Sequence, residues 1–266
     1  MAGLVRWRPW APDYEQYIGM LIGSEALGLV VGFLVHHPML VAFPLVVPPY
    51  VAAKALWRRH GRAFVREMRE AHDALNAGNF ARARESFAYW AANRPSPALA
   101  AIARHDLAWT AMCEGELEEA RDLQLHGLTK DRKSLERAGL VQLSSIDLAL
   151  LFALLGDLET AETWIAEAEK PAKKAPRRGV EAIIAVVRAV VALRRDRAAD
   201  AVQILEDNWS MCEARLSGDT MRPIYVIRAF ARREELSYQR PKYPGELAYI
   251  GTAWPEMAEF LAANGY

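Results

Sequence analysis

The histidines of this sequence are the side chains best suited to acid–base or metal chemistry, and their spacing argues against both. There are six of them: His36, His37, His60, His72, His105 and His126. No pair has the i, i+4 spacing with a glutamate that a zinc hydrolase needs. His105 and Asp106 are adjacent on an expected helix, so their side chains diverge, and we interpret His105 as a surface or packing residue. His36 and His37 could titrate near neutral pH, but we favour the interpretation that they are polar residues at a membrane boundary.

Other motifs for catalysis or ligand binding are missing from the sequence. It has no glycine-rich phosphate loop with lysine, no Gly-x-Ser-x-Gly elbow and no Cys-x-x-Cys pair. Cys113 and Cys212 lie in apolar, helix-like stretches, and we expect two buried free thiols of a reducing compartment. We therefore predict a protein that is not an enzyme and uses no cofactor or metal. The alternative is a catalytic site assembled from scattered residues.

The overall charge balance bears on the class of partner. Lys plus Arg number 33 and Asp plus Glu number 33, so the formal net charge is zero. A nucleic-acid binder needs many uncompensated cations, and we expect no nucleic-acid partner. One basic run, at residues 170–178, reads KPAKKAPRR. It is either a solvated linker or a contact for anionic lipid or an acidic partner.

Two apolar runs near the N-terminus predict a membrane hairpin. Residues 17–35 and 39–57 are apolar and are separated by His36-His37-Pro38. Nineteen helical residues span about 28 Å, close to the roughly 30 Å of a bilayer core. Arginines flank the hairpin on both outer sides, which predicts cytoplasmic termini. The competing reading is a hairpin buried in a soluble protein, which Glu25 and the internal prolines favour.

Further along, a short pattern recurs four times. It begins at Gly78, Gly115, Gly156 and Asp196, in steps of 37, 41 and 40 residues. Each start is followed five residues later by an alanine, at Ala83, Ala120, Ala161 and Ala201. A period of this size indicates stacked helical hairpins. The first residue would turn the chain where φ is positive, and the alanine would sit where two helices cross closely.

This pattern resembles the tetratricopeptide repeat family over about residues 62–208. The family's small residue seven before the turn is matched by Ala71, Ala108, Ala149 and Ala189. Its large apolar residue nine after the turn is matched by Phe87, Ile165 and Leu205, and Gln124 departs from the pattern. The resemblance implies an all-α solenoid of antiparallel hairpins that serves protein–protein interaction.

The resemblance also implies a concave face lined by the first helix of each unit. Counting back from the turn residues gives our candidate partner-binding positions, which are Ile102, His105, Trp109, Met112, Leu143, Ile146, Leu150, Val186 and Val190. Family members that grip a terminal carboxylate place lysine, arginine and asparagine there, so that mode is not expected. An apolar trough needs an occupant. The occupants considered are the chain's own aromatic tail and an amphipathic helix of a partner, unless these residues are simply core.

Together these patterns predict three regions. Residues 1–60 form a hydrophobic, membrane-associated hairpin that contacts lipid through residues 17–57. Residues 61–210 form the repeats, and residues 211–266 form a helical cap. The expected function is a membrane-anchored adaptor or scaffold with its repeats on the cytoplasmic side, where it binds a protein partner. The alternative is a soluble, cytoplasmic scaffold or regulatory subunit whose apolar N-terminus is buried in an obligate complex.

Overall fold

The computed structural model describes residues 50–51, 61–93, 96–170, 179–216, 218–236 and 241–266. These residues form helices joined by turns, without any β-strand, so the all-α prediction is confirmed for this part of the chain. The predicted membrane hairpin lies outside the described residues, except for Tyr50 and Val51. Within the described ranges no single helix is long and apolar enough to cross a membrane. Within these ranges, one pair of consecutive helices, Arg132–Ala138 and Val141–Leu155, has the length and composition of a span when taken together, but the two are bent by 117° relative to each other.

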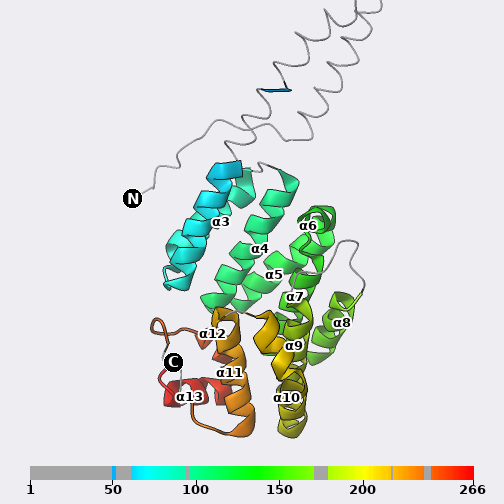
Figure 1. The fold of residues 1–266 in the computed structure, drawn as a ribbon, viewed down its shortest axis with the longest axis vertical. Helices are drawn as coiled ribbons and strands as arrows, with labels where there is room; N and C mark the ends of the chain where they lie inside the picture. Colours follow the sequence, from blue (N-terminus) through cyan, green and yellow to red (C-terminus); the bar gives the residue numbers. More distant parts are fainter. Residues whose placement is uncertain (1–49, 52–60, 94–95, 171–178, 217, 237–240) are drawn as a thin grey trace, which may run out of the picture.

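The first long described helix covers residues 61–76, and we refer to it as helix 61–76. The elements that follow are shown in Figure 1. Their bounds are α3 (Phe80–Asn93), α4 (Pro97–Cys113), α5 (Leu117–Lys130), α6 (Arg132–Ala138), α7 (Val141–Leu155), α8 (Leu158–Ala168), α9 (Val180–Arg194), α10 (Ala198–Arg215), α11 (Gly218–Arg232), α12 (Ala248–Gly251) and α13 (Pro255–Ala263).

The helices pack mainly on their neighbours in sequence, and the four predicted turns join them. In this arrangement α4 packs on α3 and α5, α7 on α8, and α9 on α10, while α5, α7 and α9 lie in one continuous row. The turn residues all have positive φ, at 75° for Gly78, 85° for Gly115, 91° for Gly156 and 59° for Asp196. The expected left-handed turns are therefore confirmed, including the one where an aspartate replaces glycine.

The four alanines that follow the turns are completely buried. Ala83, Ala120, Ala161 and Ala201 each have 0% exposure. Two of the polar residues after the turns also cap the next helix. Asn79 Oδ1 accepts from the Arg82 amide at 3.3 Å, and Asp157 Oδ1 accepts from the Thr160 amide at 3.1 Å. Each turn thus ends one helix, starts the next and brings both into close contact.

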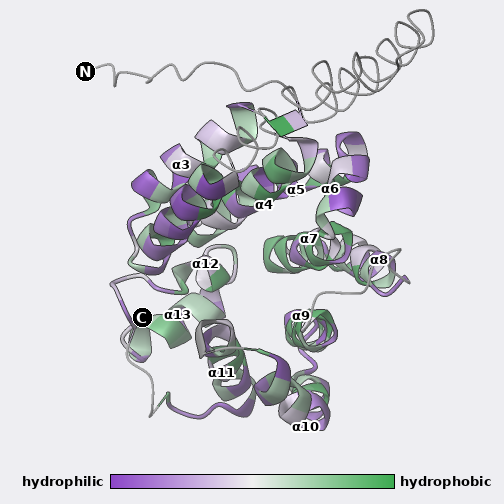
Figure 2. Ribbon diagram, turned by 45° about the horizontal axis from the view of Figure 1, so that its top comes forward, coloured by the Kyte–Doolittle hydropathy of each residue, from purple (hydrophilic) through white to green (hydrophobic). Residues whose placement is uncertain are grey.

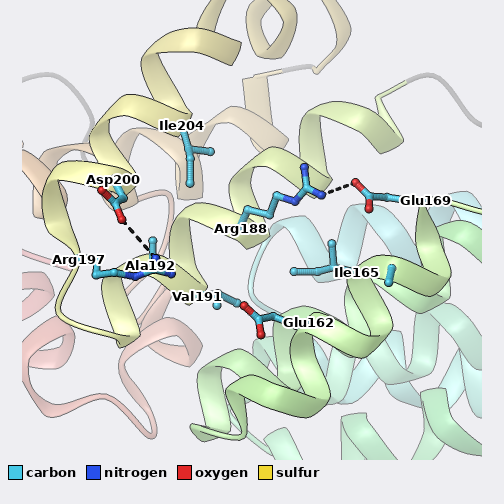
Figure 3. A pocket seen from close by; sticks show the side chains of 10 residues that line it. Glu162, Ile165, Glu169, Arg188, Val191, Ala192, Arg197, Asp200 and Ile204 are labelled. Carbon is cyan, nitrogen blue, oxygen red and sulfur yellow. Dashed lines mark hydrogen bonds and ion pairs between the residues drawn. The ribbon is translucent and has the colours of Figure 1, made fainter.

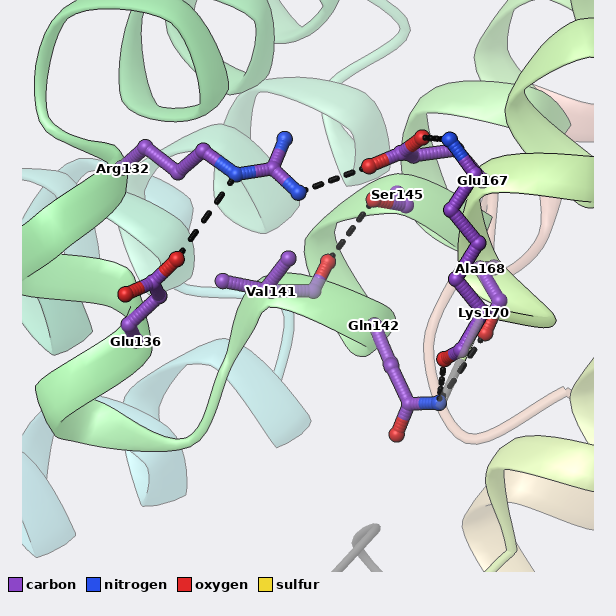
Figure 4. A network of polar contacts seen from close by, with 8 residues as sticks. All are labelled: Arg132, Glu136, Val141, Gln142, Ser145, Glu167, Ala168 and Lys170. Carbon is purple, nitrogen blue, oxygen red and sulfur yellow. Dashed lines mark hydrogen bonds and ion pairs between the residues drawn. The ribbon is translucent and has the colours of Figure 1, made fainter. Parts of the chain in front are cut away.

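The short helix α6 is an element that the repeat pattern did not predict. It lies between α5 and α7, and Gly139 ends it with φ of 69°. Figure 4 shows how this region is tied to the end of α8. Arg132 Nη2 donates to Glu167 Oε1 at 2.7 Å, and Gln142 Nε2 donates to the carbonyl oxygens of Ala168 and Lys170 at 3.1 and 3.0 Å. The extra helix lies within the longest repeat step, and these bonds satisfy carbonyls that the end of α8 leaves free.

The C-terminal tail, residues 241–266, returns to the first turns of the chain. The ring of Tyr243 lies over Gly78, where a Cβ atom would approach it to 2.8 Å, and stacks edge-on with Phe80 at 5.8 Å between centroids. The Thr252 side chain lies over Gly115 in the same way, at 3.2 Å from such an atom. In Figure 2, α12 and α13 lie between α4 and α11. The tail, which contains α12 and α13, therefore packs on the turns at Gly78 and Gly115 near the start of the described chain.

The buried alanines generate a prediction about packing. Ala83→Leu should lower the free energy of unfolding by about 1–3 kcal/mol, because added methyl groups force apart helices that already touch. Ala88→Leu is the matched control, since Ala88 is exposed on the same helix. Urea unfolding followed by circular dichroism measures both. Equal stability of the two variants would show that the helices around Ala83 leave space for a larger side chain.

Candidate functional site

Most of the predicted partner-binding positions belong to the same hydrophobic cluster as residues of the chain's own tail. Met112, Ile146 and Val190 are at most 1% exposed, and Val186 is also buried. Trp109, Leu143 and Leu150 are partly buried against the same hydrophobic cluster, which contains the tail residues Tyr249, Ile250, Trp254 and Met257. Ile102 belongs to two smaller clusters instead. The structure thus brings most of the predicted positions together, and their partner-binding role stays a prediction.

Several aromatic and polar contacts hold the tail on this inner face. The rings of Trp109 and Tyr249 lie 6.4 Å apart, and Trp254 packs edge-on against Phe230 at 5.1 Å. The guanidinium of Arg194 lies 5.2 Å from the centre of the Trp254 ring. Such contacts add to the burial of the ring surfaces. Of the occupants considered for the inner face, the tail is the one in contact with it.

Two polar links fix the ends of the tail. Arg222 Nη1 donates to Glu246 Oε2 at 2.9 Å, and the Glu246 side chain is 9% exposed. Near the C-terminus, Asn264 Oδ1 accepts from the Leu236 amide at 2.7 Å. A buried carboxylate needs a cation or donors around it, and Arg222 supplies both. The tail is therefore anchored by charge at its start and by a hydrogen bond at its end.

A cluster of polar side chains lies beneath the inner face, between α4, α5 and α7. His105 Nδ1 is 3.2 Å from Gln124 Nε2 and 3.2 Å from Ser144 Oγ, while His105 Nε2 is 3.6 Å from Asp147 Oδ2. The His105 side chain is 9% exposed, so of the two roles expected for it, surface or packing, the structure shows packing. The departure of Gln124 from the apolar repeat pattern was the sequence signal for this cluster.

Asp106 points away from His105, as expected for neighbours on a helix. Its Oδ2 atom lies 3.3 Å from His72 Nε2, and His72 Nδ1 lies 2.7 Å from the Met68 carbonyl oxygen. The Asp106 carboxylate is the main cause that raises the pKa of His72 above its ordinary value. This second pair links α4 to helix 61–76. Polar contacts therefore connect α4 to helix 61–76 on one side and to α5 and α7 on the other.

Burial controls the electrostatics of the cluster. It raises the pKa of Asp147 to about 6, an effect that His105 opposes and Asp106 adds to. Burial also raises the pKa of Tyr249 in the tail well above its ordinary value. Ser144, His105 and Asp147 are residue types that can form a nucleophilic trio. Ser144 is 0% exposed, however, so its hydroxyl cannot meet a substrate in this arrangement.

A pair of adjoining clefts lies on the other side of α9 from the predicted positions. Figure 3 shows the first, a cleft of about 390 Å³ between α8, α9 and α10. The second, of about 580 Å³, shares Glu169, Arg188 and Ile204 with it. The repeat pattern gave no sign of these clefts, because it singled out inward positions on the first helices only.

The clefts combine an apolar floor with a charged rim. Ile165 and Val191 lie at the floor of the first cleft and are 4% and 3% exposed. On the rim, Arg188 Nη2 donates to Glu169 Oε1 at 2.6 Å, and both side chains are solvent-exposed. Such a surface suits a protein segment that has one apolar and one charged side.

No three His, Cys, Asp or Glu side chains within the described ranges are grouped so that they could hold a metal ion. The two cysteines are free thiols. Cys212 is buried, as expected, whereas Cys113 is only half-buried. Comparisons with protein-family models, with curated proteins and with solved structures found no match for this chain.

The polar cluster generates a prediction about pH. The pKa of Asp147 is higher in the folded protein, at about 6, than its ordinary 3.8, so the folded state binds this proton more tightly. The contribution of the protonated Asp147 side chain to the free energy of unfolding is fully present below pH 4. It is lost as the pH rises through 6, by roughly 3 kcal/mol in total. Asp147→Asn should therefore raise the melting temperature at pH 7.5 and leave it nearly unchanged at pH 4. Asp122→Asn, at an exposed position of α5, is the control. Destabilisation of Asp147→Asn at pH 7.5 would contradict the assignment.

The contacts of the tail generate a prediction about stability. Tyr249→Ala should lower the free energy of unfolding by about 3–5 kcal/mol, because it removes a buried ring from the inner face. Tyr89→Ala, which truncates a partly buried ring on α3, should cost clearly less. Thermal unfolding of both variants provides the measurement. A small effect of Tyr249→Ala would mean that the tail adds little to the fold.

Proposed function

We propose that the chain is a tetratricopeptide-like scaffold, attached to a membrane through residues 17–57, that binds a protein partner on the cytoplasmic side. The likeness to that family is supported by the positive-φ turns at all four repeat starts and by the alanines buried after them. Stacked hairpins of this kind present long grooves between successive helices. The membrane part is supported by the two apolar runs and the arginines around them.

The pair of adjoining clefts over α8, α9 and α10 is the observation that carries the partner-binding proposal. They form one connected depression with apolar floor residues and a charged rim, on the side of α9 that the tail does not cover. An amphipathic helix from a partner fits such a depression by its apolar face. The inner positions, from Ile102 to Val190, would meet a partner only after the tail has left.

The alternative is a soluble scaffold or regulatory subunit with its apolar N-terminus buried in an obligate complex. It is favoured by Glu25 and the prolines inside the apolar runs. Carbonate extraction of the expressed protein separates the two proposals. Protein that stays in the membrane pellet supports attachment, and protein released by carbonate supports the complex.

The cleft proposal predicts the effect of filling the cleft. Ala166 is an exposed residue of its wall, so Ala166→Trp adds a large side chain there without entering the core. Quantitative affinity capture from cells should show at least about tenfold less of the wild-type partner, equivalent to about 1.4 kcal/mol of binding. Ala88→Trp, exposed on α3, should capture it normally.

A separate variant tests whether the partner binds at the predicted inner positions. Trp109→Ala with Leu150→Ala removes two side chains that pack against the core, so the pair should lower the melting temperature. If Ala166→Trp captures the partner normally while this inner pair loses capture with its melting temperature intact, the partner binds the inner face and the cleft proposal is wrong.

A further inference from the structure

The exposed apolar side chains are concentrated at one end of the molecule. Among the described residues, the large hydrophobic side chains left exposed are Tyr50 at 49%, Val51 at 57% and Val65 at 57%. Scattered single cases are normal on protein surfaces, but these three fall within sixteen positions of one another. They lie within or just after the apolar runs, the second of which ends at Trp57. The large apolar side chains that are exposed among the described residues therefore lie at its N-terminal end.

Helix 61–76 places arginines around the exposed valine. Arg62, Val65, Arg66 and Arg69 follow the i, i+3, i+4, i+7 spacing of one helix face, and all four are exposed. We call these four residues the arginine face. The opposite side of the helix packs inward through Phe64, Met68 and Ala71, which are buried. Phe64 packs edge-on against Trp90 of α3, at 5.2 Å between centroids, which fixes the rotation of the helix. The arginine face must therefore point away from the stack.

Charge is also ordered along this helix. The arginine face occupies the first half of the helix, a length of about 10 Å, and the exposed acids Glu70 and Asp73 follow it. One acid, Glu67, lies within that half and pairs with Arg66 at 3.6 Å. Two more arginines, Arg58 and Arg59, precede the face in the sequence, directly after the apolar run. The order along the chain is therefore apolar, mainly basic, then acidic. A bilayer has the matching order of hydrocarbon, anionic headgroups and water.

We propose that the arginine face lies on the anionic headgroups of the membrane, with Val65 inserted among them. The inference rests on the membrane attachment proposed above and adds the lipid class and the residues that contact it. Each arginine close to an anionic surface strengthens partitioning by about fivefold, or about 1 kcal/mol, so three give on the order of a hundredfold. Long arginine side chains can keep their charge at the headgroups while a short valine goes deeper.

The test measures whether residue 65 contacts lipid in the full-length chain. Val65→Cys carries a fluorescent label, and the protein is reconstituted into vesicles that contain brominated lipids as quenchers. One set of vesicles is phosphatidylcholine, and the other contains about a third phosphatidylserine. Native thiols label poorly, because Cys212 is buried and burial raises the pKa of Cys113 to about 12. The unsubstituted chain measures the remaining background.

We expect strong quenching at residue 65 in the anionic vesicles and little in the neutral ones. Salt at about 1 M, where the Debye length is about 3 Å, should reduce it. The triple variant Arg62→Gln, Arg66→Gln, Arg69→Gln should also abolish it. Arg137→Gln, Arg215→Gln, Arg233→Gln makes the same charge change at exposed positions outside the clefts and should leave it intact. A label at Gln203→Cys, exposed on α10, should stay unquenched throughout.

The outcomes separate this inference from the attachment on which it rests. Vesicles that retain the protein but leave residue 65 unquenched would overturn the lipid contact and keep the attachment. Quenching that is the same in both kinds of vesicle, or in the triple variant, would overturn the role of the arginines. A chain that associates with neither kind of vesicle would overturn both proposals. Circular dichroism of every variant confirms that the helices are intact.

Discussion

A side chain no larger than one methyl group sets the distance between the paired helices of this protein. Ala83, Ala120, Ala161 and Ala201 are inaccessible to solvent, and each follows a turn whose first residue has positive φ. The turn fixes the direction in which the chain re-enters, and the alanine lets the two helix backbones approach. Because the same pair of conditions recurs along the chain, the row formed by α5, α7 and α9 is regular enough to leave a continuous inner face.

The regular parts of this structure were predictable because they depend on residues close in sequence. The turns at Gly78 and Asp196 and the burial of Ala83 follow from a local pattern that the sequence displays directly. The helix α6 was not, because a seven-residue helix between two longer ones shifts the repeat step by only a few residues. The clefts beside Arg188 were missed for a different reason. They form between elements from separate repeats, and no local pattern describes the space between them.

The docking of the tail could be proposed from sequence but not located. Aromatic residues near the C-terminus and an apolar inner face suggested an occupant, yet the contacts of Tyr243 with Gly78 and of Tyr249 with Trp109 join residues more than a hundred positions apart. The cluster around His105 could not be located from the sequence either. Its partners come from α5 and α7, and only the polar Gln124 at an apolar position indicated that something needed a hydrogen bond there.

The return of the tail to the first turns also sets the order of events during synthesis. The inner face of α4 leaves the ribosome long before residues 241–266 that cover it, and at about 5–20 residues per second the interval is roughly seven seconds to half a minute. Throughout that time Trp109 and its apolar neighbours lack their final cover. A nascent chain in this state is a substrate for chaperones, and a prematurely terminated one keeps the exposed surface permanently. Loss of the last two dozen residues should therefore lead to aggregation and degradation of the whole chain, rather than to a stable shorter protein.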